Sequence, residues 1–70
     1  MTTKEFNSSQ LKRGEYSYAD NSLIITFTND KKYEYKEVPP EKWEALCAAE
    51  SAGRYFNAEI KNTFKFFKHG

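Results

Sequence analysis

The sequence predicts an α+β domain in which a three-stranded antiparallel β-meander is covered on one face by two C-terminal helices. Apolar residues alternate with other residues at Leu23, Ile25 and Phe27, and the alternation resumes in the Tyr-Glu-Tyr run at 33–35. Period-two alternation on both sides of a short Asn-Asp break indicates a β-hairpin with one buried face. A Val-Pro-Pro sequence then leads directly into helical spacing, which predicts helices over the sheet.

The remaining strand of the meander is predicted ahead of this hairpin. Tyr16 and Tyr18 alternate with polar neighbours, and an Asp-Asn-Ser turn sequence at 20–22 separates them from the second strand. The second strand is predicted from Leu23 to Thr28, and the third over residues 32–36. Apart from Met1 and Phe6, residues 1–9 are polar, so a flexible N-terminus is expected.

The loop between the second and third strands decides which face of the sheet carries Tyr33 and Tyr35, because a slip of one residue turns every side chain over. A two-residue loop would send both rings to the exposed face, as a stacking platform for bases. A three-residue loop would pair Ile25 with Tyr33 and Phe27 with Lys31, and would place both tyrosines in the core. The shorter loop needs positive φ at two non-glycine residues and the longer loop at only one, so the longer loop is favoured.

Two helices are predicted after the hairpin. Pro39 and Pro40 suit a first helical turn, and this helix is expected to end near Glu50. Ser51 is the expected N-cap of a second helix. The apolar positions of the second helix recur every four residues, at Phe56, Ile60 and Phe64.

The residue types exclude several classes of function. Cys47 is the only cysteine and His69 the only histidine, so no disulfide, metal site or cofactor is expected. No catalytic motif surrounds either residue, and the protein is expected to be non-enzymatic. No apolar run is long enough to cross a membrane, and the polar start lacks the apolar core of a secretory signal. A cytoplasmic location is therefore expected, in a bacterium or in a bacterial host of a phage.

Charge is unevenly distributed, although the formal net charge is only +1. Residues 37–50 hold four glutamates and one lysine, whereas residues 51–70 hold four basic residues and one glutamate. Ordinary solvated helix faces account for this pattern. Alternatively, the second helix carries a basic edge for nucleic acid, on which lysines contact phosphates and an aromatic ring stacks on a base. The residues of this basic edge are Arg54, Tyr55, Lys61, Lys65 and Lys68.

The order and spacing of several motifs resemble the KTSC domain family. They include Ser8-Ser9-x-Leu11, Leu23-x-Ile25-x-Phe27, Tyr33-x-Tyr35, Val38-Pro39 and Ser51-x-Gly53-x-Tyr55-Phe56-Asn57. The resemblance spans about residues 8–64, which is the expected ordered core of a single domain of residues 1–70. The family is named for a short domain at the C-terminus of some lysyl-tRNA synthetases, and it also occurs as stand-alone bacterial and phage proteins. The resemblance implies no catalytic residues and, through the synthetase context, RNA as a ligand.

Two functional hypotheses remain open at this point. The first is a non-enzymatic module that binds RNA or another nucleic acid. The second is a protein-interaction module, for example a phage-encoded modulator or inhibitor of a host protein. Such a module would dock through the acidic first helix and the apolar tail, using Glu41, Glu44, Phe66 and Phe67. The near-neutral net charge favours the second hypothesis, and the family resemblance favours the first.

Overall fold

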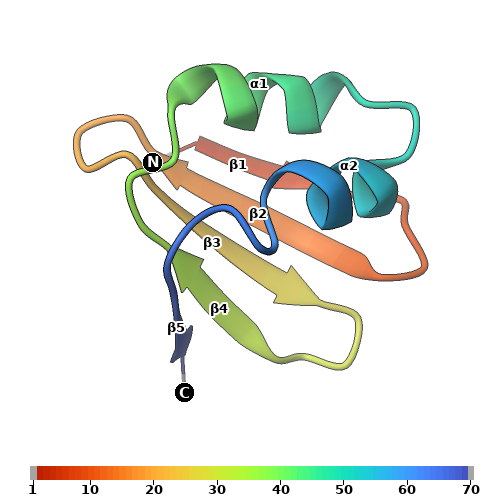
Figure 1. The fold of residues 1–70 in the computed structure, drawn as a ribbon. Helices are drawn as coiled ribbons and strands as arrows, with labels where there is room; N and C mark the ends of the chain where they lie inside the picture. The colour runs from red at the N-terminus through yellow and green to blue at the C-terminus, as the bar shows by residue number, and fades with distance from the viewer. Residues whose placement is uncertain (1, 70) are drawn as a thin grey trace.

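The computed structural model describes residues 2–69, and Figure 1 shows two helices packed on one face of an antiparallel sheet. The strands are β1 (Thr2–Glu5), β2 (Leu11–Ser17), β3 (Ser22–Phe27), β4 (Lys32–Tyr35) and β5 (Phe66–His69), and they follow this order across the sheet. The helices α1 (Pro40–Ala48) and α2 (Ala52–Glu59) lie between β4 and β5 in the chain. The α+β class and the two covering helices are thus confirmed, while the outermost positions of the expected domain, 1 and 70, lie outside the described residues.

The prediction of a three-stranded sheet was wrong, because a further strand lies at each edge and the sheet has five. β1 comes from the segment expected to be flexible, and it pairs with β2 so that Thr2 lies opposite Tyr16. β5 comes from the C-terminal tail and pairs with β4, with Phe66 opposite Tyr35. Neither edge strand has a buried residue and neither alternates in hydrophobicity, so the period-two signal was absent from both. Their main-chain groups pair because β2 and β4 would otherwise present open edges.

The β3–β4 hairpin has the predicted three-residue loop. Ile25 lies opposite Tyr33, and the Phe27 N–H donates to the Lys31 carbonyl at 2.8 Å. Asp30 adopts the left-handed conformation with a φ of 67°, at the one loop position where this turn needs it. The tyrosine pair therefore lies on the face that the helices cover.

Burial of this tyrosine pair is unequal. Tyr35 is 2% exposed, and its ring meets the Phe56 ring of α2 edge-on with centroids 5.4 Å apart. Tyr33 is only half-buried. Trp43 of α1 lies over β2, where its ring stacks on Tyr16 at 5.6 Å. The core thus has two aromatic centres, one beneath each helix.

The second helix is shorter than its apolar spacing predicted. Ser51 caps it as expected, with its hydroxyl accepting the Arg54 N–H at 3.4 Å, but the helix ends at Glu59. The chain then turns through Ile60 and Phe64 back to the sheet, so the predicted basic helix is corrected to a short helix followed by a loop and β5. A longer helix would leave the outer edge of β4 unpaired. Neither α1 nor α2 has the length and apolar character that a membrane crossing requires.

Candidate functional site

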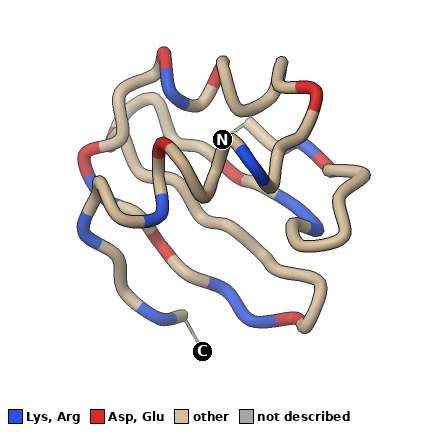
Figure 2. Tube along the Cα trace, turned by 45° about the vertical axis from the view of Figure 1, so that its right-hand side comes forward, with Lys and Arg blue, Asp and Glu red and all other residues tan. Residues whose placement is uncertain are grey.

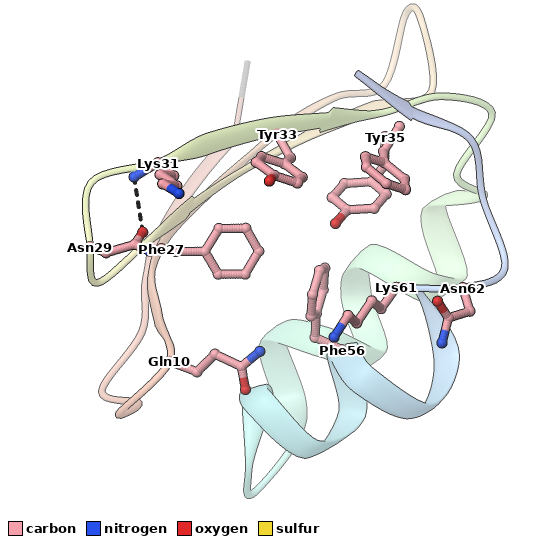
Figure 3. A pocket seen from close by; sticks show the side chains of 10 residues that line it. Gln10, Phe27, Asn29, Lys31, Tyr33, Tyr35, Phe56, Lys61 and Asn62 are labelled. Atoms are coloured by element: carbon pink, nitrogen blue, oxygen red, sulfur yellow. Dashed lines mark hydrogen bonds between the residues drawn. The ribbon is translucent and has the colours of Figure 1, made fainter. Parts of the chain in front are cut away.

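A pocket of about 290 Å³ opens on the covered side of the sheet, between the β3–β4 hairpin, β5 and the end of α2 (Figure 3). Its aromatic walls are Phe27, Tyr33, Tyr35, Phe56 and Phe66. Its polar lining consists of Gln10, Asn29, Lys31, Lys61 and Asn62. An apolar cavity with a few convergent polar groups is the usual form of a small-ligand site.

The register of three strands fixes the aromatic walls. The Tyr33 ring stacks on Phe66 of β5 with centroids 5.5 Å apart and planes 9° from parallel. Phe27 of β3 meets the same tyrosine edge-on at 5.6 Å. Phe56 closes the helical side, with its ring 5.6 Å from Phe27. Because each ring packs against another, the walls are held by the sheet and by α2 rather than by loops alone.

The hydroxyl of Tyr35 enters this pocket without a hydrogen-bond partner. Among residues 2–69, the tyrosine hydroxyls with hydrogen bonds are those of Tyr16 and Tyr18. Figure 3 shows the phenol end of Tyr35 directed into the space between the sheet and α2. Burial, with a smaller effect of Tyr33, raises the pKa of Tyr35 to about 12, so the hydroxyl keeps its proton at neutral pH. It is a hydrogen-bond donor that faces the cavity.

Positive charge gathers at the pocket without acidic partners. Lys31 and Lys61 are both exposed, and within the described part of the chain neither takes part in a salt bridge. Lys68 lies opposite Tyr33 in the β4–β5 pair, and its side chain therefore leaves the sheet on the same face. Lys31 and Lys61 thus line the aromatic surface and Lys68 lies on the same face of the sheet, and within residues 2–69 no carboxylate lines the pocket.

The five residues of the predicted basic edge do not form one surface in the structure. Lys61 lines the pocket, Lys68 lies on its face of the sheet, and Lys65 lies in the loop before β5. Arg54 is exposed on α2 and Tyr55 is half-buried against the core, and neither of them lines the pocket. Figure 2 shows the basic residues of this C-terminal part spread along the chain rather than on one helix.

Several pocket residues were missed by the sequence analysis. The favoured register already placed Lys31 opposite Phe27, on the covered face, and this signal was sufficient to find it. Gln10 had no such signal, because it reaches the pocket from the β1–β2 connection. Its amide exchanges two hydrogen bonds with Asn57 of α2, at 3.2 and 3.1 Å. Asn62 belongs to the turn after α2, which the longer predicted helix concealed.

The residues expected to dock a protein do not form one surface. Glu41 and Glu44 are exposed on α1, whereas Phe66 and Phe67 lie on β5, at the other edge of the molecule (Figure 1). Consecutive residues of a strand point to opposite faces, so Phe66 faces the pocket and Phe67 faces the side without helices. Phe66 is 51% exposed and Phe67 is 55% exposed.

The histidine and the cysteine are not among the residues that line the pocket. His69 Nε2 lies 2.9 Å from Glu34 Oε1 on the side of the sheet without helices. Burial raises the pKa of the Cys47 thiol, which disfavours the reactive thiolate. Among residues 2–69, no three His, Cys, Asp or Glu side chains are grouped so as to hold a metal ion. What the pocket offers is ring surface, a hydroxyl donor and positive charge, which are means of binding.

These features define a small α+β domain with one helix-covered sheet face and an aromatic pocket at its β4–β5 edge. The chain belongs to the KTSC domain family, whose model matches residues 7–64. The resemblance inferred from the motifs is thereby confirmed.

Similar proteins include both small proteins and a segment of a large enzyme. A KTSC domain protein from Yersinia pestis has a solved structure with a TM-score of 0.93 and 29% identity, covering 99% of this chain and 97% of that one. A protein from Tsukamurella paurometabola is 41% identical over 58 residues, which are 83% of this chain and 87% of that protein. A lysine-tRNA ligase from Nostoc punctiforme is also 41% identical over 58 residues, but these are only 10% of the ligase.

Proposed function

We propose that this domain is a non-enzymatic, cytoplasmic module that binds single-stranded RNA across the pocket and the lysines beside it. The observation that carries the proposal is an aromatic surface lined by Lys31 and Lys61, with Lys68 on the same sheet face and no lining carboxylate among residues 2–69. Lysines contact phosphates and aromatic rings stack on bases, and proteins that bind single strands combine these two contacts. The similarity to a segment of a lysine-tRNA ligase supports RNA as the ligand class.

The proposed RNA surface lies on the pocket side of the sheet, and not along the second helix as the sequence predicted. Arg54 and Lys65 remain exposed and are available for further phosphate contacts. Tyr55 is half-buried and contributes packing rather than stacking. Because a net charge of +1 gives little long-range attraction, a dissociation constant in the micromolar range or weaker is expected.

The test is the salt dependence of RNA binding. Fluorescence anisotropy of a short labelled single-stranded RNA is measured over a series of salt concentrations. Each phosphate contact contributes about −0.7 to the slope of log affinity against log salt, so three lysines predict a slope of about −2. Lys31→Glu and Lys61→Glu should each reduce the slope and together abolish binding.

Adjacent residues supply a matched control. Lys32 follows Lys31 in the chain but points to the other face of the sheet, opposite Thr26. Lys32→Glu makes the same change in net charge and should leave RNA binding nearly unchanged. Absence of a complex at low salt, with circular dichroism showing a folded protein, would refute RNA binding.

A protein partner is the second candidate, favoured by the open outer edge of β5 and the exposed Phe67 ring. An edge strand with free main-chain groups can accept a strand from another chain. In this case a complex isolated from a bacterial lysate should survive nuclease treatment. Phe67→Glu should disrupt it, and Lys61→Glu should not. Glu41→Lys and Glu44→Lys would show whether α1 also contacts the partner.

A further inference from the structure

The size of the pocket fits one planar ring system. A dry protein cavity of about 150 Å³ accepts a benzene molecule, so a volume of about 290 Å³ has room for a larger ring. The walls are the faces and edges of five aromatic side chains. Such walls favour a flat, polarisable ligand over an extended aliphatic chain or a compact ion.

The Tyr35 hydroxyl favours a ligand ring that carries a hydrogen-bond acceptor. The residue is 98% buried by accessible area, and its hydroxyl has no partner among residues 2–69. This hydroxyl is not one of the fully enclosed unpaired atoms, because it faces the open pocket, and a ligand that offers an acceptor there gives it a hydrogen bond inside the protein. The ligand ring should therefore bear a carbonyl oxygen or an unprotonated ring nitrogen at its inner edge.

The two lysines of the pocket lining favour a ligand that also carries negative charge. Figure 3 shows Lys61 extending past Phe56 into the pocket region from the end of α2, and Lys31 lies across the cavity on the hairpin. Neither lysine is neutralised by a carboxylate within the described chain. A ring with an acceptor at one end and an anionic group at the other is what a nucleotide presents.

We propose that the pocket binds one nucleotide unit of single-stranded RNA, with its base inserted between the aromatic walls, an acceptor atom on the Tyr35 hydroxyl, and its phosphate at Lys31 and Lys61. This inference rests on the proposed function and deepens it. All four bases carry a suitable acceptor, so the pocket selects an unstacked base rather than a particular sequence.

The test compares two probes that differ only in the base. Uridine 5′-monophosphate and ribose 5-phosphate are titrated into the full chain, and the chemical shifts of the aromatic rings are followed by NMR. The nucleotide should shift the Tyr33, Tyr35 and Phe56 ring resonances, whereas ribose 5-phosphate should affect only signals near the two lysines. Cytidine, adenosine and guanosine 5′-monophosphates should behave like the uridine compound.

Two variants test the assigned contacts. Tyr35→Phe keeps the ring and removes only the unpartnered hydroxyl, so the fold should persist while nucleotide affinity falls about fivefold. Lys61→Gln should produce a similar loss through the phosphate. Tyr18→Phe, which alters an exposed tyrosine outside the pocket, should leave the affinity unchanged.

The possible failures are distinguishable from one another. If RNA binds with the expected salt slope but no nucleotide shifts the pocket rings, the base-insertion inference is wrong and the proposed function stands. Unchanged nucleotide affinity in Tyr35→Phe would also overturn the inference. If neither RNA nor any mononucleotide binds, both proposals fail. Displacement of the nucleotide by ribose 5-phosphate at equal concentration would show that the phosphate alone is recognised, and this too would overturn insertion of the base.

Discussion

The Tyr33 ring stacks on the Phe66 ring across the β4–β5 pair, with centroids 5.5 Å apart and planes 9° from parallel. This contact joins the central hairpin to a strand that the chain reaches only after both helices. It also builds one wall of the pocket, so the same pair of rings holds the edge strand and shapes the candidate site.

Phe66→Ala should loosen β5 with only a modest effect on the rest of the fold. Full burial makes a Phe→Ala change cost about 3–5 kcal/mol, and a residue that is 51% exposed should cost roughly half of this. Hydrogen exchange of the β5 amides should become faster. Phe67→Ala is the control, because this ring is similarly exposed but points to the other face. Equal effects of the two changes would contradict a specific role of the stacked pair.

Phe56→Ala should reduce the free energy of unfolding by about 3–5 kcal/mol. The ring is 0% exposed, and it contacts both Phe27 and Tyr35 in the aromatic cluster beneath α2. Urea denaturation followed by circular dichroism measures the change. Arg54→Ala, at an exposed position of the same helix, should cost little. A small effect of Phe56→Ala would show that α2 does not depend on this ring for docking.

Gly14→Ala should destabilise the fold by about 1–3 kcal/mol. A Cβ at this position would lie 2.9 Å from Phe6 Cε2 and also 2.9 Å from Trp43 Cζ3, and the tryptophan is buried and cannot move freely. Gly53→Ala is the comparison. Its Cβ would lie 3.2 Å from the Ser8 Oγ, and the gain in helix propensity offsets part of that close contact. Thermal melting of both variants should show the larger loss for Gly14→Ala.

Tyr16→Phe should lower the free energy of unfolding more than Tyr35→Phe, although both changes remove a hydroxyl from a buried ring. Tyr16 donates to the Val38 carbonyl, a bond that ties β2 to the segment before α1, and its loss leaves a buried acceptor unpaired. We expect a cost of about 1–3 kcal/mol for Tyr16→Phe. Tyr35→Phe should change the free energy of unfolding by less than about 1 kcal/mol, since no partner is lost. The two values come from matched urea titrations, and a large cost for Tyr35→Phe would reveal a hydrogen bond that the pocket assignment excludes.

Glu34 should make the stability of the domain depend on pH. Hydrogen bonds from Lys36, then from His69, lower the pKa of this carboxyl below its ordinary value of 4.5. Because the folded-state pKa lies below the unfolded one, the contribution is complete above pH 4.5 and is lost as the pH falls through the folded-state value. Glu34→Gln should therefore be less stable than the native chain at neutral pH, and the difference should shrink in acid. Glu50→Gln, at an exposed carboxyl without a described salt bridge, is the control for the loss of one negative charge.

The central hairpin and the helix starts could be predicted from the sequence because their determinants are local. The observed loop needs positive φ at Asp30 alone, whereas a two-residue loop would need it at two non-glycine residues. This difference decides the register that buries Tyr35. Ser51 and Pro40 mark the helix starts through capping and through a preset φ, which act within one turn of the chain.

The edge strands and the pocket required the tertiary structure. β1 and β5 have no strand pattern of their own, and they form because β2 and β4 leave main-chain donors and acceptors open. The pocket gathers Gln10, Lys31, Lys61 and Phe66 from four separate segments of the chain. Local sequence fixes turns, caps and the face of a strand, whereas the pairing of edges and the meeting of distant side chains depend on which surfaces the folded core leaves open.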